Sequence, residues 1–150
     1  MERRRGADLL TDDIERMHVS TIHGWLSNEA YWSMGRSVEA VSESLRHSRV
    51  YGVFRDGRQI AFARVITDDV SFAYLCDVFV ESAHRRESVG SWVLDTILDD
   101  LRDRGIAQIL LATRDAHTFY ERAGFHPLTR PERWLEVDPT SAPPRGETDD

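Results

Sequence analysis

The stretch from Asp77 to Leu94, DVFVESAHRRESVGSWVL, places the strongest constraint on the fold of this chain. It opens with a short run rich in β-branched and aromatic side chains, which is typical of a strand. From Val89 onward, apolar residues recur at the spacing of one buried helical face, at positions 89, 93, 94, 97, 98 and 101. The segment therefore predicts a strand, a loop and a helix in direct succession.

The loop of this segment has the composition of an anion-binding helix start. It holds Arg85 and Arg86, followed by the small residues Ser88, Gly90 and Ser91. A helix start offers unpaired backbone N–H groups and the positive end of the helix dipole, and arginines add charge-assisted bonds to phosphate. We interpret the loop as a diphosphate cradle. The alternative is an ordinary connection with solvated arginines, because Gly- and Ser-containing helix starts are common.

Bulk composition favours one globular domain in a cytoplasmic protein. The chain has 150 residues, of which 41% are hydrophobic and 30% charged. The net charge of -7 disfavours non-specific nucleic-acid binding. We expect no membrane partner, because no apolar stretch approaches the ~20 residues of a membrane span and no apolar run follows the N-terminal arginines. The single cysteine, Cys76, lies in an apolar strand pattern and is expected to be reduced and buried.

The N-terminal part of the chain predicts one short strand and two helices. Residues 1–7 are charged and unpatterned, so we expect them to be disordered. A strand over 9–11 precedes a helix over 19–28 with one apolar face, and Ser37 is a suitable N-cap for a second helix that ends near residue 47. Two aromatic residues, Tyr31 and Trp32, lie between these helices, where they could either line a pocket or fill the core beneath the loop.

Three consecutive antiparallel strands follow the second helix. Residues 50–54 and 59–66 are strand-like runs joined by an Asp-Gly pair, which is a hairpin-turn signal. After a turn over 67–71, residues 72–80 form the third strand and lead into the cradle. The remaining predicted elements are a strand over 108–112, a helix over 115–123, short strands over 125–128 and 133–137, and a disordered acidic tail over 138–150. This order predicts an α+β fold with a mixed, mostly antiparallel sheet flanked by helices.

Two motifs in this order resemble the GNAT acetyltransferase superfamily. Residues 85–91, RRESVGS, are similar to its acetyl-CoA loop, Q/R-x-x-G-x-G/A, although Ser88 stands at the first motif glycine and Arg86 where many members have glycine. Residues 119–125, FYERAGF, are similar to its Tyr-x-x-x-Gly-Phe signature. The order of helices and strands is also that of the GNAT fold, so the resemblance covers a GNAT domain over residues 8–137.

The resemblance implies that the chain moves an acetyl group from acetyl-CoA to a small-molecule or peptide amine, by direct attack in a ternary complex. The implied acetyl-CoA ligands are Val78, Phe79 and Val80 on the strand, and Arg85, Arg86, Glu87, Ser88, Val89, Gly90 and Ser91 in the loop. The departures at Arg86 and Ser88 leave a second interpretation open, in which the protein binds acyl-CoA or a protein partner without turnover. A homodimer is compatible with either interpretation, and no metal site is predicted.

Tyr120 matches the family position of a general acid, and a neutral phenol can donate a proton to a developing thiolate. It could also only pack near the sulfur. Asp77 is the candidate base, because strand alternation would place it on the side of Leu75 and Phe79, where burial of its carboxylate would raise the pKa. It could equally be a structural hydrogen-bond acceptor. By position within the resemblance, Tyr31, Trp32 and Tyr74 are candidate substrate-side residues.

Overall fold

The computed structural model describes residues 1–141 and contains a six-stranded sheet with the strands in sequence order. The strands are β1 (Glu2–Arg5), β2 (Asp8–Thr11), β3 (Arg49–Arg55), β4 (Arg58–Thr67), β5 (Phe72–Val80) and β6 (Gln108–Leu110). Neighbouring strands are antiparallel from β1 to β5, whereas β5 and β6 are parallel. The parallel pair requires a crossover connection, which the helix after the loop supplies.

Residues 1–141 also form four α-helices and four short 3-10 helices, and the last helix of each kind follows the final strand. The α-helices are α1 (Val19–Asn28), α2 (Val38–Arg46), α3 (Val89–Asp103) and α4 (His117–Arg122). The 3-10 helices are η1 (Ile14–Arg16), η2 (Tyr31–Ser33), η3 (Ser82–His84) and η4 (Pro131–Arg133). The expected fold class is confirmed, as are the three-strand meander and the helices over 19–28 and 89–103. None of the helices within residues 1–141 is long and apolar enough to cross a membrane.

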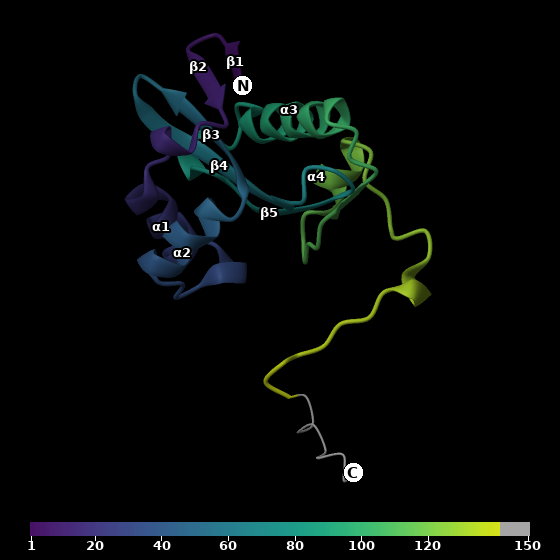
Figure 1. Cartoon of the computed structure of the whole chain (residues 1–150). Helices are drawn as coiled ribbons and strands as arrows, with labels where there is room; N and C mark the ends of the chain where they lie inside the picture. Colours follow the sequence, from purple (N-terminus) through teal and green to yellow (C-terminus); the bar gives the residue numbers. More distant parts are fainter. Residues whose placement is uncertain (142–150) are drawn as a thin grey trace.

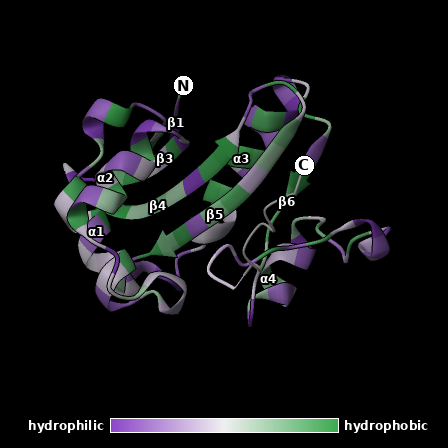
Figure 2. Ribbon diagram, turned by 60° about the horizontal axis from the view of Figure 1, so that its bottom comes forward, coloured by the Kyte–Doolittle hydropathy of each residue, from purple (hydrophilic) through white to green (hydrophobic). Residues whose placement is uncertain are grey.

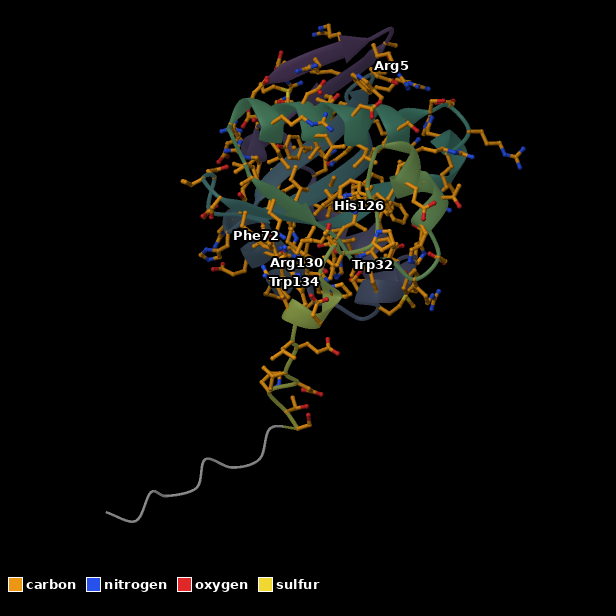
Figure 3. The ribbon with its side chains drawn as sticks, turned by 90° about the vertical axis from the view of Figure 1, so that its right-hand side faces the viewer. Arg5, Trp32, Phe72, His126, Arg130 and Trp134 are labelled. Atoms are coloured by element: carbon orange, nitrogen blue, oxygen red, sulfur yellow. The ribbon has the colours of Figure 1, made fainter. Side chains whose placement is uncertain are left out.

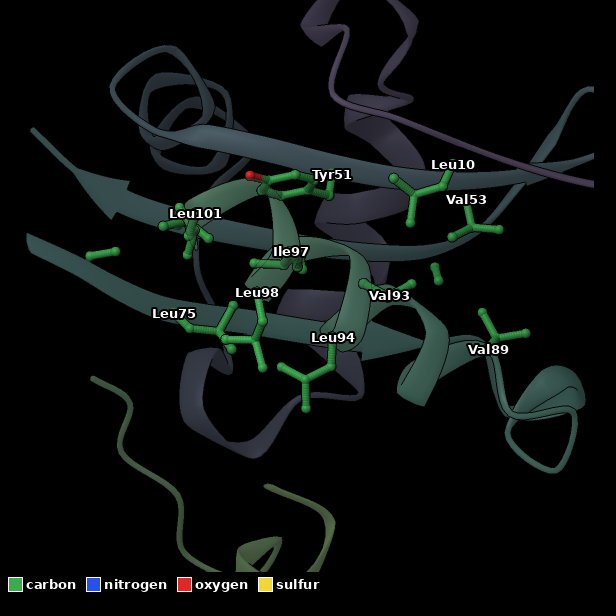
Figure 4. Packing of buried hydrophobic residues seen from close by; sticks show 14 of the residues in the cluster. Leu10, Tyr51, Val53, Leu75, Val89, Val93, Leu94, Ile97, Leu98 and Leu101 are labelled. Carbon is green, nitrogen blue, oxygen red and sulfur yellow. The ribbon is translucent and has the colours of Figure 1, made fainter. Parts of the chain in front are cut away.

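Helices cover the sheet on both faces, so the domain has two hydrophobic cores. The helix α3 packs on one face, and α1 and α2 pack on the other (Figure 1). Hydrophobic residues gather on the central strands between these layers (Figure 2). Figure 4 shows the α3 face of the sheet, where Val89, Val93, Leu94, Ile97, Leu98 and Leu101 of the helix meet Leu10, Tyr51, Val53 and Leu75 of the strands. The helical periodicity of the sequence therefore identified the buried side of α3 correctly.

The N-terminus is ordered, so the expectation that residues 1–7 are disordered was wrong. Residues Glu2–Arg5 pair antiparallel with Asp8–Thr11 and form an edge strand. The side chains of this strand are mostly exposed, so it carries no hydrophobic pattern from which it could be predicted. Charged side chains are common on edge strands, because they discourage pairing with other chains.

The chain after α4 also differs from expectation. Residues 125–128 and 133–137 form no strand, and the segment runs along and then away from the body (Figure 1). Pro127 and Pro131 lack the N–H groups that a central strand needs. Leu135 is 96% exposed, so the apolar residues that suggested a buried strand here are not buried. Of the tail expected over 138–150, residues 138–141 are exposed and the rest lie outside the described residues.

We expect Ile97→Ala to lower the free energy of unfolding by about 2–5 kcal/mol, because Ile97 is fully buried in the core between α3 and the sheet. Urea denaturation would measure the change. The matched control is Asp95→Ala on the exposed side of the same helix, which should change stability by less than about 0.5 kcal/mol. Equal losses for the two variants would show that α3 does not pack on the sheet as described.

Candidate functional site

The site lies where β5 and β6 separate. The two strands pair only from Phe72–Gln108 to Tyr74–Leu110. Beyond that point β5 continues to Val80 with β4 on one side and no strand on the other. Among residues 1–141, the β6 side of Leu75–Val80 therefore has no strand partner. The backbone of the predicted ligands Val78, Phe79 and Val80 lies along this unpaired edge. Main-chain polar groups on this side are open to an extended ligand, apart from the Val80 carbonyl, which accepts from Arg85 Nε.

A β-bulge interrupts β5 at Asp77. On the other edge of the strand, Phe79 pairs with Phe62 of β4 but Cys76 pairs with Arg64, so two residues of β5 oppose one of β4. Asp77 takes up the extra residue with a positive φ of 51°. Such a conformation is uncommon outside glycine and indicates a local constraint on the backbone.

The bulge reverses which face of the sheet each β5 side chain occupies. Before it, Ala73 and Leu75 pack into the α3 core. After it, Phe79 packs into the α1–α2 core, while Val78 and Val80 adjoin the α3 core. A strict two-residue alternation along 72–80, which we assumed in placing Asp77 on the side of both Leu75 and Phe79, therefore fails at this point.

Asp77 is buried, as expected, but its electrostatic environment differs from the prediction. Trp32 Nε1–H donates to Oδ1 at 2.9 Å, and Arg36 Nη1 and Arg64 Nε donate to Oδ2 at 2.9 Å and 2.8 Å. Burial alone would raise the pKa of Asp77, but the bonds from Arg64 and Arg36 outweigh it and the pKa is lowered. The expected raised pKa was wrong. The charged carboxylate stabilises the fold above its unfolded-state pKa of about 3.9, and this contribution is lost as the pH falls through the lowered folded-state value.

The predicted cradle is formed by the chain between η3 and α3. Ser88 has φ 60° and ψ 22°, a left-handed conformation, and immediately precedes the helix. The backbone N–H groups of Ser88, Val89, Gly90 and Ser91 have no hydrogen-bond partner among the residues that the structure describes. A Cβ on Gly90 would lie 3.5 Å from Phe119, which is an ordinary contact, so the protein itself does not require glycine there. Four successive free N–H groups at a helix start are the donors that an anion site would use.

Arg5 fixes the orientation of this loop, which the sequence did not indicate. Its Nη1 donates to the carbonyl of Ser88 at 3.0 Å and its Nη2 to the carbonyl of Glu87 at 3.1 Å. The guanidinium group also lies over the ring of Trp92, 5.0 Å from its centre. Because the C=O and N–H of one trans peptide point in opposite directions, holding these carbonyls turns the N–H groups of Ser88 and Val89 to the other side. Figure 3 shows Arg5 beside the β1–β2 hairpin.

The acidic side chain of the loop is turned away from a ligand role. Glu87 binds Arg55 and His84, each at 3.0 Å. Its pKa is lowered by the hydrogen bond from His84 and by Arg55. The carboxylate of Glu87 thus anchors the loop to β3, while its backbone N–H donates to the carbonyl of His84 and its carbonyl accepts from Arg5. An uncompensated carboxylate beside a diphosphate would be unfavourable, so this arrangement suits an anion.

The two arginines of the loop lie differently. Arg85 Nε donates to the carbonyl of Val80 at 3.0 Å, and its guanidinium lies 5.2 Å from the centre of the Phe79 ring. It thus folds back along the end of β5, towards the unpaired edge. Arg86 is exposed and has no hydrogen bond within residues 1–141. Both arginines remain candidate ligands, and Arg85 is the one turned towards the unpaired edge of β5.

Tyr120 projects from α4 into the α3 core and is largely buried. The rings of Phe119 and Phe125 meet it edge to face, with centroids 5.0 Å and 5.9 Å away. Burial raises the pKa of Tyr120 to about 12, and the neighbouring phenol of Tyr31 adds to the shift. The Tyr120 hydroxyl has no hydrogen-bond partner in the described part of the chain. It is therefore a protonated, unengaged donor at neutral pH.

The aromatic residues expected on the substrate side are only partly brought together. Tyr31 and Trp32 meet edge to face with centroids 5.2 Å apart, and both are about 40% exposed. The Tyr31 hydroxyl accepts from the backbone N–H of Arg114 at 3.2 Å, which ties η2 to the segment before α4. Tyr74 instead lies beside Leu110 where β5 and β6 are still paired, and it stacks on neither ring.

Two cavities flank β6, and the sequence predicted neither. One has a volume of about 650 Å³ and lies between the end of α3, β6 and the segment that includes Trp134. The other, about 320 Å³, lies between β6 and α4 and reaches His117. Neither includes the loop over 85–91. We centre the proposed chemistry on the loop and Tyr120 rather than on the larger cavity, because the loop carries the free N–H groups and Tyr120 an unengaged proton donor. Phe119 connects the two, since its ring lies beside both Gly90 and Tyr120.

Comparisons with known proteins agree with this geometry. The profile described as "Acetyltransferase (GNAT) family" matches residues 13–125. The crystal structure of a GNAT-family protein from Xanthomonas campestris is 36% identical and superposes with a TM-score of 0.83, covering 87% of this chain and 92% of that one. FG08082 of Gibberella zeae, a provisionally assigned acetyltransferase, is 27% identical over 141 residues, 80% of each chain.

A plant enzyme is a further relative. The chloroplastic serotonin N-acetyltransferase 2 of Oryza sativa subsp. japonica is 33% identical over 107 residues, which are 65% of this chain and 54% of that protein. The matched profile spans most of this chain and includes both the cradle and α4. The resemblance inferred from the loop and the Tyr-x-x-x-Gly-Phe motif is thus confirmed, and the chain belongs to the GNAT acetyltransferase family.

Proposed function

We propose that this protein is an N-acetyltransferase that moves the acetyl group of acetyl-CoA directly to an amine. The observation that carries the proposal is the row of four free N–H groups over residues 88–91, beside the unpaired edge of β5. The helix start would hold the diphosphate, and the main chain of 78–80 would pair with the amide groups of the pantetheine arm. A family structure from Elizabethkingia anophelis, 12% identical with a TM-score of 0.63, has acetyl-CoA bound, which supports the same use of the fold here.

The residues of this chain suit a one-step transfer. The amine nitrogen attacks the thioester carbonyl carbon, the C–S bond breaks, and the sulfur leaves with a proton from the Tyr120 phenol, which then regains a proton from water. The thiol of Cys76 is unsuited to a covalent acetyl intermediate, because burial raises its pKa to about 11 and keeps it protonated at neutral pH. The nitrogen loses its proton to water, since both oxygens of Asp77 are already engaged.

The acceptor is proposed as a small-molecule or peptide amine that enters beside Tyr31 and Trp32. The name of the rice relative points to an aromatic amine, and two half-exposed rings at the entrance would suit such an acceptor. The second candidate is a protein that binds acyl-CoA without turnover. It is favoured by the strained Ser88 and by Arg86, which depart from the glycines of the motif.

Exchanging Ser88 for glycine tests whether the left-handed residue carries strain. A non-glycine residue in this conformation costs about 1–2 kcal/mol. Replacing it with glycine removes that strain, but part of the gain is offset because glycine loses more conformational entropy on folding. We expect Ser88→Gly to raise the free energy of unfolding by up to about 1 kcal/mol and to tighten acetyl-CoA binding in calorimetry. Weaker binding would show instead that the serine hydroxyl is a ligand.

Gly90→Ala is the complementary variant for the same titration. Alanine fits the protein at this position and is the better helix former, so stability should hold or rise. Its methyl group would crowd a diphosphate at the helix start, so acetyl-CoA binding should weaken. If neither variant alters binding, the loop is only a structural connection and the proposed function loses its main support.

Tyr120→Phe should lower kcat by about 10²–10⁴-fold, the usual contribution of a general acid, with little change in the Kd of acetyl-CoA. Steady-state acetylation assays and calorimetry separate these effects. Because its pKa is about 12, the phenol stays protonated through neutral pH, so kcat should show no fall attributable to Tyr120 below about pH 10. An unchanged kcat in the variant would remove Tyr120 from the mechanism.

A further inference from the structure

We propose that Asp77 is a positioning residue, whose buried carboxylate holds the segment of Tyr31 to Arg36 against β5 and thereby sets the acceptor side of the site. The inference rests on the proposed function and replaces a base role for Asp77. It concerns how an amine is received, not how acetyl-CoA is bound.

The carboxylate joins parts of the chain that are distant in sequence. Trp32 and Arg36 come from the connection between α1 and α2, whereas Arg64 comes from β4. Arg64 also donates to Ser48 Oγ at 3.0 Å, which ties the same cluster to the start of β3. With 4% of Asp77 exposed, these bonds lie largely out of water, where each is stronger and harder to replace.

The held segment is anchored to α1 at its other contacts. Ser33 Oγ donates to the carbonyl of Leu26 at 2.7 Å, and the carbonyl of Arg36 lies 3.0 Å from His23 Nε2. These bonds fix the backbone to the helix but leave the Trp32 ring free to turn. The bond from the indole N–H to Asp77 selects one orientation of the ring. The exposed face of Trp32 is therefore held in a fixed position towards an incoming acceptor.

The same geometry argues against proton transfer to Asp77. A base must have a free lone pair within hydrogen-bond reach of the substrate proton. Here two cationic groups occupy Oδ2 and a neutral donor occupies Oδ1. Protonating the carboxylate would leave the partly buried cations of Arg36 and Arg64 beside a neutral group, which is unfavourable.

The test compares Trp32→Phe and Asp77→Asn in acetylation assays. We expect each to raise the KM of the amine acceptor by about tenfold, the factor for one lost hydrogen bond to a charged group, with a smaller effect on kcat and on acetyl-CoA affinity. Trp134→Phe is the matched control, because Trp134 is 42% exposed against 43% for Trp32 and lies in the C-terminal segment. It should leave the acceptor KM unchanged.

A base role for Asp77 gives a different pattern. Asp77→Asn would lower kcat by about 10²–10⁴-fold and remove the acidic limb of its pH profile, while Trp32→Phe would have no effect. That result would overturn the proposal. Positioning by Asp77 predicts that the acidic limb keeps its place in both variants. Trp32→Phe removes one donor from a half-exposed ring, so it remains informative if Asp77→Asn fails to fold.

Hydrogen exchange supplies a readout that does not depend on turnover. Amides of residues 31–36 should exchange faster in both variants than in the wild type, while α3 keeps its protection. Unchanged exchange in both variants would refute the positioning role. Failure of the wild type to acetylate any amine would refute the proposed function alone, because the exchange measurement would still decide whether Asp77 holds this segment.

Discussion

A buried carboxylate between two guanidinium groups is the interaction on which the site depends. Asp77 holds one extra residue in β5 and is held in turn by Arg36 and Arg64. Because of the extra residue, Ala73 and Leu75 in the first half of the strand pack into the α3 core, whereas Phe79 in the second half packs into the α1–α2 core. Without it, Phe79 would face the wrong layer, since a shift of one residue exchanges the two faces of a strand.

The unpaired end of β5 and the loop after it lie between two residues with a positive φ angle. Asp77 at φ 51° and Ser88 at φ 60° lie on either side of the exposed end of β5 and the loop. Both are non-glycine residues, so each conformation is maintained by its surroundings: Asp77 by its arginines, Ser88 by the bonds from Arg5 to the loop carbonyls. Local strain at both ends of one segment is consistent with a backbone arranged for ligand contact rather than for strand pairing.

The N-terminal hairpin thereby becomes part of the site. Arg5 of β1 reaches the carbonyls of residues 87 and 88, more than eighty positions along the chain. Arg55 of β3 adds a second connection through Glu87. The loop is thus supported by side chains from the sheet while its N–H groups remain free, which is the preorganisation that anion binding requires.

The sequence predicted what periodicity and turn chemistry encode. The buried side of α3 and the Asp-Gly hairpin follow from residue patterns, and the structure confirms both. The loop over 85–91 lies between β5 and α3, as its composition predicted, and its role as a diphosphate cradle belongs to the proposed function. The strand β1 has no apolar pattern, so it was missed. The strands expected near 125–128 and 133–137 have apolar residues but no pairing partner within residues 1–141. The bulge and the reach of Arg5 depend on long-range contacts that no local pattern carries.

Acetyl-CoA is proposed to bind between the start of α3 and the unpaired edge of β5. Two-dimensional amide NMR of the whole chain during an acetyl-CoA titration tests it most directly. If acetyl-CoA binds there, the largest shifts fall on the amides of residues 78–80 and 88–91. Shifts confined to the cavity between α3, β6 and Trp134, with the loop amides unmoved, would contradict it.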